Sequence, residues 1–145
     1  MPDSASRGWR YLEDRFGVTK ECLEDHRLKE VSGDLWLVSE GLGTGLDVET
    51  YGIRFIRIMD VGLKPTTYGL QLIGRYIQDN VVELDRQELV KLLRREEMVE
   101  REMESKGYVA LRYEDRVIGC GFYKNGNVSS RVPKGRGKEL LDILT

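Results

Sequence analysis

The chain has 145 residues, 40% of them hydrophobic and 33% charged, which suits one folded domain or two small modules packed together. Its formal net charge is −2, from 23 Lys and Arg against 25 Asp and Glu, which excludes a uniformly basic protein that coats nucleic acid. Two cysteines and one histidine are too few for a zinc site of four cysteines, or of two cysteines and two histidines, within one chain.

No run of the sequence approaches the roughly 18 apolar residues of a membrane span. Residues 1–7 contain no apolar signal core, and two cysteines do not make a disulfide framework. These features predict a soluble, cytoplasmic protein with reduced thiols and no membrane partner.

The N-terminal segment has helical periodicity. Trp9, Leu12 and Phe16 are spaced to lie on one face of a helix, and Gly17 follows as its stop. Thr19 is a candidate cap for a short second helix.

Strands are predicted next, at residues 35–38 and 51–59, with a glycine-rich loop over residues 40–47 between them. In a regular strand successive side chains alternate between faces, so Arg54 and Arg57 point in opposite directions. The two arginines share a face only if a bulge intervenes.

A turn at residues 64–67 starts another helix. Thr66 is the predicted N-cap, and this helix runs to about Ile77. A short strand is predicted over residues 81–84.

Asp85 and Glu88 have the spacing of a capping box and open a further helix. Residues 94–106 are dense in charge and are interpreted as a solvated continuation of this helix or as a loop. The predicted apolar face of the helix consists of Leu89, Leu92, Leu93 and Met98.

The last third of the chain predicts antiparallel strands. Alternation over residues 108–113 and 116–123 predicts a hairpin. Asn125-Gly126 is a strong turn signal and leads to a third strand near residues 128–132. A short helix is predicted over residues 139–144.

These elements together predict an α+β fold in two modules. A small N-terminal α/β module covers residues 1–79, and a mostly antiparallel, barrel-like domain covers residues 80–145. The helix after Asp85 is expected to cover one opening of the barrel.

The signals for catalysis are weak. His26 is interpreted as a surface residue, and Cys22, four residues away, is not made a nucleophile by that spacing alone. Cys120 lies between two glycines in an apolar strand and is interpreted as a small buried residue. The loop at residues 41–45 lacks the remaining residues of a nucleotide-binding motif. No catalytic residue, cofactor or metal is predicted, and a small enzyme using His26 or a pair of carboxylates stays open as an alternative.

Positive charge is segregated in the sequence. Residues 122–138 contain no acidic residue, and the glycines at 135 and 137 predict a basic loop whose backbone can approach phosphates. Tyr123 is a candidate for stacking on a base or a half-buried strand residue. The basic residues of this segment are Lys124, Arg131, Lys134, Arg136 and Lys138. A second basic set consists of Arg54, Arg57, Lys64 and Arg75. Of these, Arg54, Lys64 and Arg75 are expected to extend the first set if both share one side.

Four segments, in this order and spacing, resemble the region that follows the catalytic domain in the Sun-family (RsmF-like) 5-methylcytosine RNA methyltransferases. They are residues 64–71, 82–89, 119–123 and 130–136. The resemblance is strongest from residue 64 to residue 136. It departs at residues 93–96, where the family tends to place a glycine after the leucine.

The resemblance implies a small α/β module followed by a PUA-like RNA-binding domain. The methyl-donor site and catalytic cysteines of the family do not fit in this chain, so the implied protein is non-catalytic. The expected partner is structured RNA, ribosomal or transfer RNA, bound alone or beside a separately encoded RNA-modifying enzyme. The alternatives are a subunit of an RNA methyltransferase and an adaptor that binds a protein through an acidic helix at residues 94–106.

Overall fold

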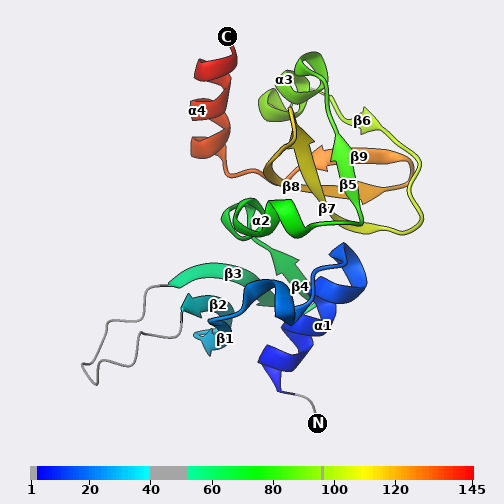
Figure 1. Cartoon of the computed structure of the whole chain (residues 1–145). Helices are drawn as coiled ribbons and strands as arrows, with labels where there is room; N and C mark the ends of the chain where they lie inside the picture. The colour runs from blue at the N-terminus through cyan, green and yellow to red at the C-terminus, as the bar shows by residue number, and fades with distance from the viewer. Residues whose placement is uncertain (1–2, 40–51, 96) are drawn as a thin grey trace.

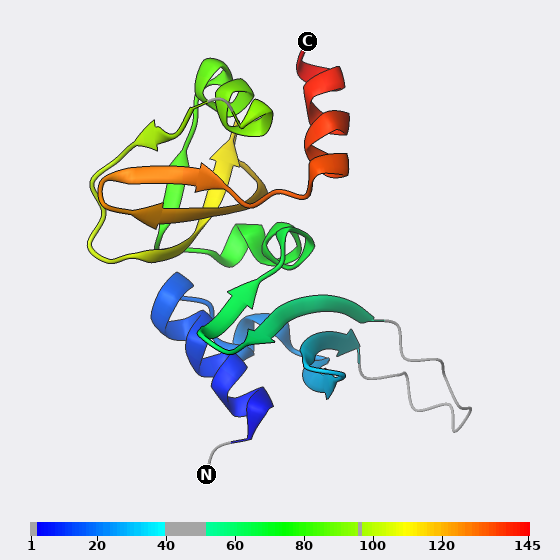
Figure 2. The ribbon, with the colours of Figure 1, turned by 180° about the vertical axis from the view of Figure 1, so that it is seen from behind.

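The computed structural model describes residues 3–39, 52–95 and 97–145. It contains two sheets, one from each half of the chain, with helices beside and between them (Figure 1). The same arrangement seen from behind shows the two chain ends at opposite ends of the molecule (Figure 2). The fold is mixed α+β, which confirms the predicted class. The glycine-rich loop predicted at residues 40–47 lies outside the described residues.

The first half forms a four-stranded antiparallel sheet in the order β1-β2-β3-β4. The predicted N-terminal helix is confirmed, since Leu12 and Phe16 are buried and Gly17 caps the helix with φ 70°. Strands β1 and β4 were not predicted, because β1 buries only Leu28 and β4 has only four residues. The elements are α1 (Ser4–Phe16), η1 (Lys20–Leu23), β1 (His26–Val31), β2 (Asp34–Ser39), β3 (Gly52–Met59), β4 (Gly62–Pro65), α2 (Thr67–Ile73) and η2 (Gly74–Tyr76).

Strand β3 contains the bulge on which the direction of its arginines depends. Leu35 of β2 pairs with Ile56, but the next residue of β2 pairs with Arg54, so Phe55 is the extra residue. Phe55 and Ile56 are both fully buried, while Arg54 and Arg57 are both exposed. The two arginines therefore reach the same carboxylate, that of Asp34.

The second half forms a curled five-stranded half-barrel in the order β5-β7-β8-β9-β6. Among the described strands of this sheet, β5 and β7 pair in parallel and the other neighbours pair antiparallel. Helix α3 lies over one end of the curl (Figure 1), and its Leu89 and Leu92 are buried in a core shared with the sheet. The elements are β5 (Val81–Glu83), α3 (Arg86–Arg94), β6 (Val99–Glu100), β7 (Gly107–Tyr113), β8 (Arg116–Lys124), β9 (Asn127–Ser130) and α4 (Lys134–Leu144).

Local signals set the two hairpins of this sheet. Both turns place their two central residues in the left-handed region, as two-residue hairpin loops require: φ is 48° and 64° at Glu114 and Asp115, and 51° and 82° at Asn125 and Gly126. Both predicted hairpins are therefore confirmed.

The two halves of the chain share a core. Helix α2 lies between the sheets (Figure 1) and packs against β3 on one side and β8 on the other. Its Thr67 Oγ1 accepts a hydrogen bond from the Cys120 main-chain N–H (3.2 Å), and Gln71 Nε2 donates to the Ile118 main-chain oxygen (3.0 Å). Cys120 and Ala110 of the second sheet belong to the hydrophobic cluster of the first half.

The prediction for the charged segment after α3 is corrected in part. The helix ends at Arg94 because Arg95 takes a left-handed conformation, φ 59°. Residues 97–106 contain no helix and include β6, so no acidic helix is present over the described part of 94–106. Met98 is 59% exposed and does not belong to the apolar face of α3.

The prediction of a basic loop over residues 134–138 is wrong. These residues are the first turns of α4, which begins at Lys134 rather than at Glu139. Pro133 suits the start of a helix because it has no N–H to leave unpaired, and its main-chain oxygen accepts from Gly137 N (2.8 Å). In the described part of the chain, no helix has the length and apolar character needed to cross a membrane.

Candidate nucleic-acid interface

Two aromatic rings and a guanidinium meet where β7, β8 and β9 lie side by side; we call Tyr108, Phe122 and Arg131 the aromatic cluster. Tyr108 and Phe122 are register partners, and their rings meet edge to face with centroids 5.0 Å apart. The Arg131 Cζ lies 5.2 Å from the centroid of the Phe122 ring. Arg131 Nη1 also donates to Ser129 Oγ (3.1 Å), so the guanidinium is held in place.

A groove of about 490 Å³ opens beside the aromatic cluster. Among the described residues that line it, three are cationic and none is acidic. Asparagine and serine side chains supply donors and acceptors on the same walls. The lining consists of Met98, Lys106, Phe122, Lys124, Asn125, Asn127, Ser129 and Arg131.

This groove continues toward α4 through two further depressions. The middle depression shares Arg131 with the first groove, and it shares Arg95 with the depression below α4. The acidic residue on this path is Glu97, whose carboxylate pairs with Lys91 (3.5 Å). The exposed cations along the path, which we call the basic track, are Lys106, Lys124, Arg131, Arg95, Arg94, Lys134 and Lys138.

Arg95 sits at the middle of the basic track and was missed by the sequence analysis. Its left-handed backbone caps α3, and its Nη2 donates to the Val132 main-chain oxygen (2.6 Å), which ties α3 to the start of α4. The signal that pointed to this position was the departure at residues 93–96, where a glycine was expected. An arginine at this position adds a cation to the surface. Its left-handed backbone conformation, which glycine adopts without strain, is unfavourable for a residue with a Cβ.

The predicted basic residues of the C-terminal segment do not all lie alike. Lys124 and Arg131 line the first groove, and Lys134 and Lys138 line the depression below α4. Arg136 is different: its Nη1 pairs with Glu139 (3.0 Å), and its Nε is buried with no hydrogen-bond partner among the described residues.

The second basic set is divided. Arg54 pairs with Asp34 at 3.5 Å, and Arg75 lies over the Tyr76 ring, 4.8 Å from its centroid. Burial raises the pKa of the Cys120 thiol to about 12, and the positive charges of Lys64 and Arg131 act against that shift. Lys64 is half-buried in β4, where its register partner in β3 is Arg57.

Several other residues considered in the sequence analysis are part of the core or bond within the fold. Tyr123 is 8% exposed and lies in the second core, which excludes it as a stacking surface and makes Phe122 the accessible aromatic of β8. Cys120 is buried, as predicted. His26 is half-buried at the start of β1, and its Nδ1 lies 3.0 Å from the Glu24 main-chain oxygen. The described residues contain no group of three His, Cys, Asp or Glu side chains placed to hold a metal ion.

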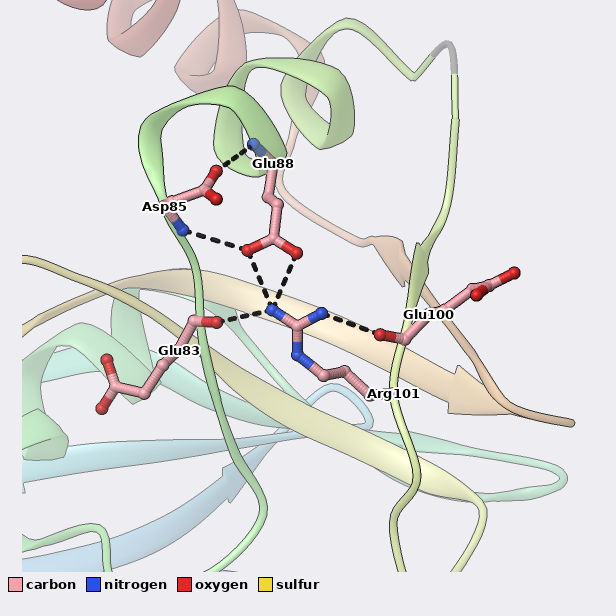
Figure 3. Close-up of polar contacts among 5 residues, drawn as sticks. All are labelled: Glu83, Asp85, Glu88, Glu100 and Arg101. Atoms are coloured by element: carbon pink, nitrogen blue, oxygen red, sulfur yellow. Dashed lines mark hydrogen bonds and ion pairs between the residues drawn. The ribbon is translucent and has the colours of Figure 1, made fainter.

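Arg101 joins the two edge strands of the half-barrel (Figure 3). Its Nη2 donates to the main-chain oxygen of Glu83, the last residue of β5 (2.9 Å), and pairs with the Glu88 carboxylate (2.9 Å). Its Nη1 donates to the Glu100 main-chain oxygen in β6 (2.7 Å). Asp85 and Glu88 form the predicted capping box, which is confirmed, so the same carboxylate serves the helix start and the arginine.

A larger groove, about 1040 Å³, lies between α1 and residues 101–105 and has a different electrostatic character. Its described lining carries four arginines and five carboxylates, and two of the arginines, Arg15 and Arg101, are engaged in hydrogen bonds to the main chain. The walls of this groove therefore offer no excess of positive charge to a polyanion, unlike the basic track.

Comparison with known proteins identifies the second half of the chain. Residues 79–136 match the family described as the methyltransferase RsmF PUA domain, and the matched segment includes no part of a methyltransferase catalytic domain. No curated protein matches the chain. The matched residues run from the start of the half-barrel to the first turn of α4 and contain the aromatic cluster and most of the basic track. Residues 79–136 are therefore a PUA domain of the RsmF type.

Proposed function

We propose that this protein binds RNA along the basic track and does no chemistry on it. The observation that carries the proposal is the continuity of the track, with exposed cations from three separate segments lining three adjoining depressions. The PUA domain supports RNA as the partner, and the expected RNA is structured ribosomal or transfer RNA. The protein then acts alone or beside a separately encoded RNA-modifying enzyme.

The charge distribution explains how a chain with a net charge of −2 attracts a polyanion. Three carboxylates of the second half are paired with cations, which reduces the repulsion that a polyanion meets: Glu83 pairs with Arg112, Glu88 with Arg101, and Glu97 with Lys91. Phosphates that contact the remaining lysines and arginines release condensed counterions, and this release drives binding. A local field of one sign is sufficient for this even when the whole protein is weakly acidic.

We propose that the predicted residues contribute unequally to RNA binding. Lys124, Lys134 and Lys138 contact the phosphates directly, Arg131 contacts the RNA beside them, and Lys64 of β4 extends the surface on the side of the first half. Arg136 and Arg54 contribute less, because each is paired with a carboxylate, and Arg75 contributes less, because it lines none of the three depressions. The boundary expected between residues 79 and 80 also remains a proposal.

Titration of a fluorescently labelled transfer RNA and of a ribosomal RNA fragment, followed by anisotropy, tests the proposal. We expect binding at about 50 mM salt that weakens strongly by about 200 mM. In a parallel nuclear magnetic resonance titration, the amide signals of residues 124, 131 and 134 should shift at lower RNA concentrations than those of β1. Absence of binding to both RNAs at the lower salt contradicts the proposal.

A further inference from the structure

We propose that the Arg131 guanidinium, supported by Phe122, is a stacking surface for one unpaired base, so that the protein prefers RNA with unpaired nucleotides over a continuous duplex. This inference rests on the proposed RNA-binding function and names the class of RNA that the site selects.

The Arg131 guanidinium is held in the position that stacking requires. It lies over the Phe122 ring, with the Cζ 5.2 Å from the ring centroid. Its Nη1 donates to Ser129 Oγ (3.1 Å) and approaches the Ser130 main-chain oxygen (3.4 Å). Arg131 is exposed, so a base can reach its guanidinium, and nucleobases stack on arginine planes.

The support below the guanidinium reaches into the first half of the chain. Phe122 meets the edge of Tyr108, and the Tyr108 main-chain oxygen accepts a hydrogen bond from Arg15 Nε of α1 (2.7 Å). Arg15 Nη1 also donates to Ser105 Oγ (2.6 Å), so the segment that leads into β7 is fixed at two points. These bonds hold the strand that carries Tyr108 in place, and a support that is already ordered reduces the entropy lost on binding.

The side chains that line the groove can contact the edge of a base as well as a phosphate. Asn125 and Asn127 line the groove beside Arg131, and an amide side chain both donates and accepts hydrogen bonds, as the edge of a base does. Lys106 and Lys124 line the same groove and can hold the phosphates on either side of that base. The bases of an A-form duplex are stacked on one another, so their faces are closed to Arg131.

The test uses three probes with the full chain: a single strand of about 12 nucleotides, the blunt duplex of the same sequence, and the single strand with a fluorescent purine analogue at its centre. We expect the single strand to bind several-fold more tightly than the duplex and the fluorescence of the analogue to be quenched on binding. Arg131→Lys keeps the charge but loses the plane. This variant should bind the duplex within about twofold of the wild type, lose the preference for the single strand and lose the quenching.

Two further variants separate stacking from folding. Phe122→Leu keeps an apolar side chain under Arg131 and should weaken the single-strand preference, while Tyr68→Leu changes an exposed aromatic of α2 and should leave it unchanged. Circular dichroism confirms that each variant is folded. If the wild type binds the duplex as tightly as the single strand and Arg131→Lys changes nothing, the stacking surface is refuted while RNA binding stands. If neither RNA binds at about 50 mM salt, the proposed function itself is refuted.

Discussion

Arg101 pairs with Glu88, with Nη2 2.9 Å from each carboxylate oxygen, and this pair links the strand β6 at one edge of the half-barrel to the helix that follows β5 at the other. The pair also explains why an arginine within an acidic segment does not belong to the basic track. Its donors are directed to the Glu83 and Glu100 main-chain oxygens and to one carboxylate, so it closes the open side of the sheet.

Arg101→Ala should lower the free energy of unfolding by about 1–3 kcal/mol, because it leaves a half-buried carboxylate and two main-chain oxygens without their donor. Urea denaturation followed by circular dichroism measures the loss. RNA affinity under folding conditions should stay the same, since Arg101 lies off the track. The control is Arg116→Ala, an exposed arginine at the start of β8, which should change stability by less than about 0.5 kcal/mol. Equal effects of the two substitutions would refute the bridging role of Arg101.

Two glycines should respond to alanine in opposite directions. Gly135 lies in α4 with nothing within 4 Å of an added Cβ, so Gly135→Ala should stabilise the protein by about 0.5–1 kcal/mol through helix propensity. At Gly119 an added Cβ meets Val132 Cγ2 at 2.5 Å, so Gly119→Ala should destabilise it by about 1–3 kcal/mol. Thermal denaturation of both variants makes the comparison, and destabilisation by Gly135→Ala would contradict a helical start at Lys134.

As the pH rises, the free energy of unfolding of the wild type should begin to fall at a lower pH than that of a variant that lacks the buried Cys120 thiol. Burial raises the pKa of Cys120 to about 12 and raises the pKa of Tyr11 above its usual value. An unfolded cysteine ionises near pH 8.5 and an unfolded tyrosine near pH 10, so the folded state holds protons that the unfolded state releases. The stability from these groups is complete below about pH 8.5 and is lost as the pH rises toward 12, by up to about 1.4 kcal/mol per pH unit for each group.

Urea midpoints of the wild type and Cys120→Ala between pH 8 and pH 11 test this expectation. Because the variant lacks the thiol, its decline should begin only near pH 10, where Tyr11 begins to contribute. Removal of the buried sulfur also lowers the free energy of unfolding by an amount that does not depend on pH. The comparison is therefore between the two pH profiles and not between absolute stabilities. Identical pH dependence of the two proteins would show that Cys120 is not protected as the structure indicates.

Lys134→Ala should weaken RNA binding more than Arg136→Ala. Lys134 is exposed and lines the depression below α4, whereas Arg136 is partly buried and paired with Glu139. Anisotropy titrations at one fixed salt concentration compare them, with Glu139→Gln added to release Arg136 from its pair. A larger loss for Arg136→Ala, with folding intact, would show that this arginine leaves Glu139 to contact RNA.

Much of the fold was predictable, because short-range signals decide it. Asp85 with Glu88, Gly17, and the Asn125-Gly126 turn each act within a few residues, and each gives the predicted local structure. The short edge strands β1, β4 and β6 have no such signal, since their residues alternate little and their pairing is decided by tertiary contacts.

The candidate site was less predictable than the fold. Lys124, Lys134 and Lys138 follow from the absence of nearby acids in the sequence, but Arg95 and Lys106 stand among glutamates and join the track only through folding. The start of α4 was missed because glycine at 135 and 137 is typical of a loop. In the structure, packing of α4 against α3 overrides that local preference.

The salt dependence of RNA binding by a double lysine variant tests most directly whether the basic track is the RNA site. Lys124→Ala with Lys134→Ala removes one cation from each end of the track, and Lys20→Ala with Lys29→Ala removes two exposed lysines from the first half as a matched control. We expect the track variant to bind transfer RNA more weakly and the slope of log affinity against log salt to shrink by about 1.4–1.8, while the control keeps the wild-type slope. A folded track variant with the affinity and slope of the wild type would contradict the account.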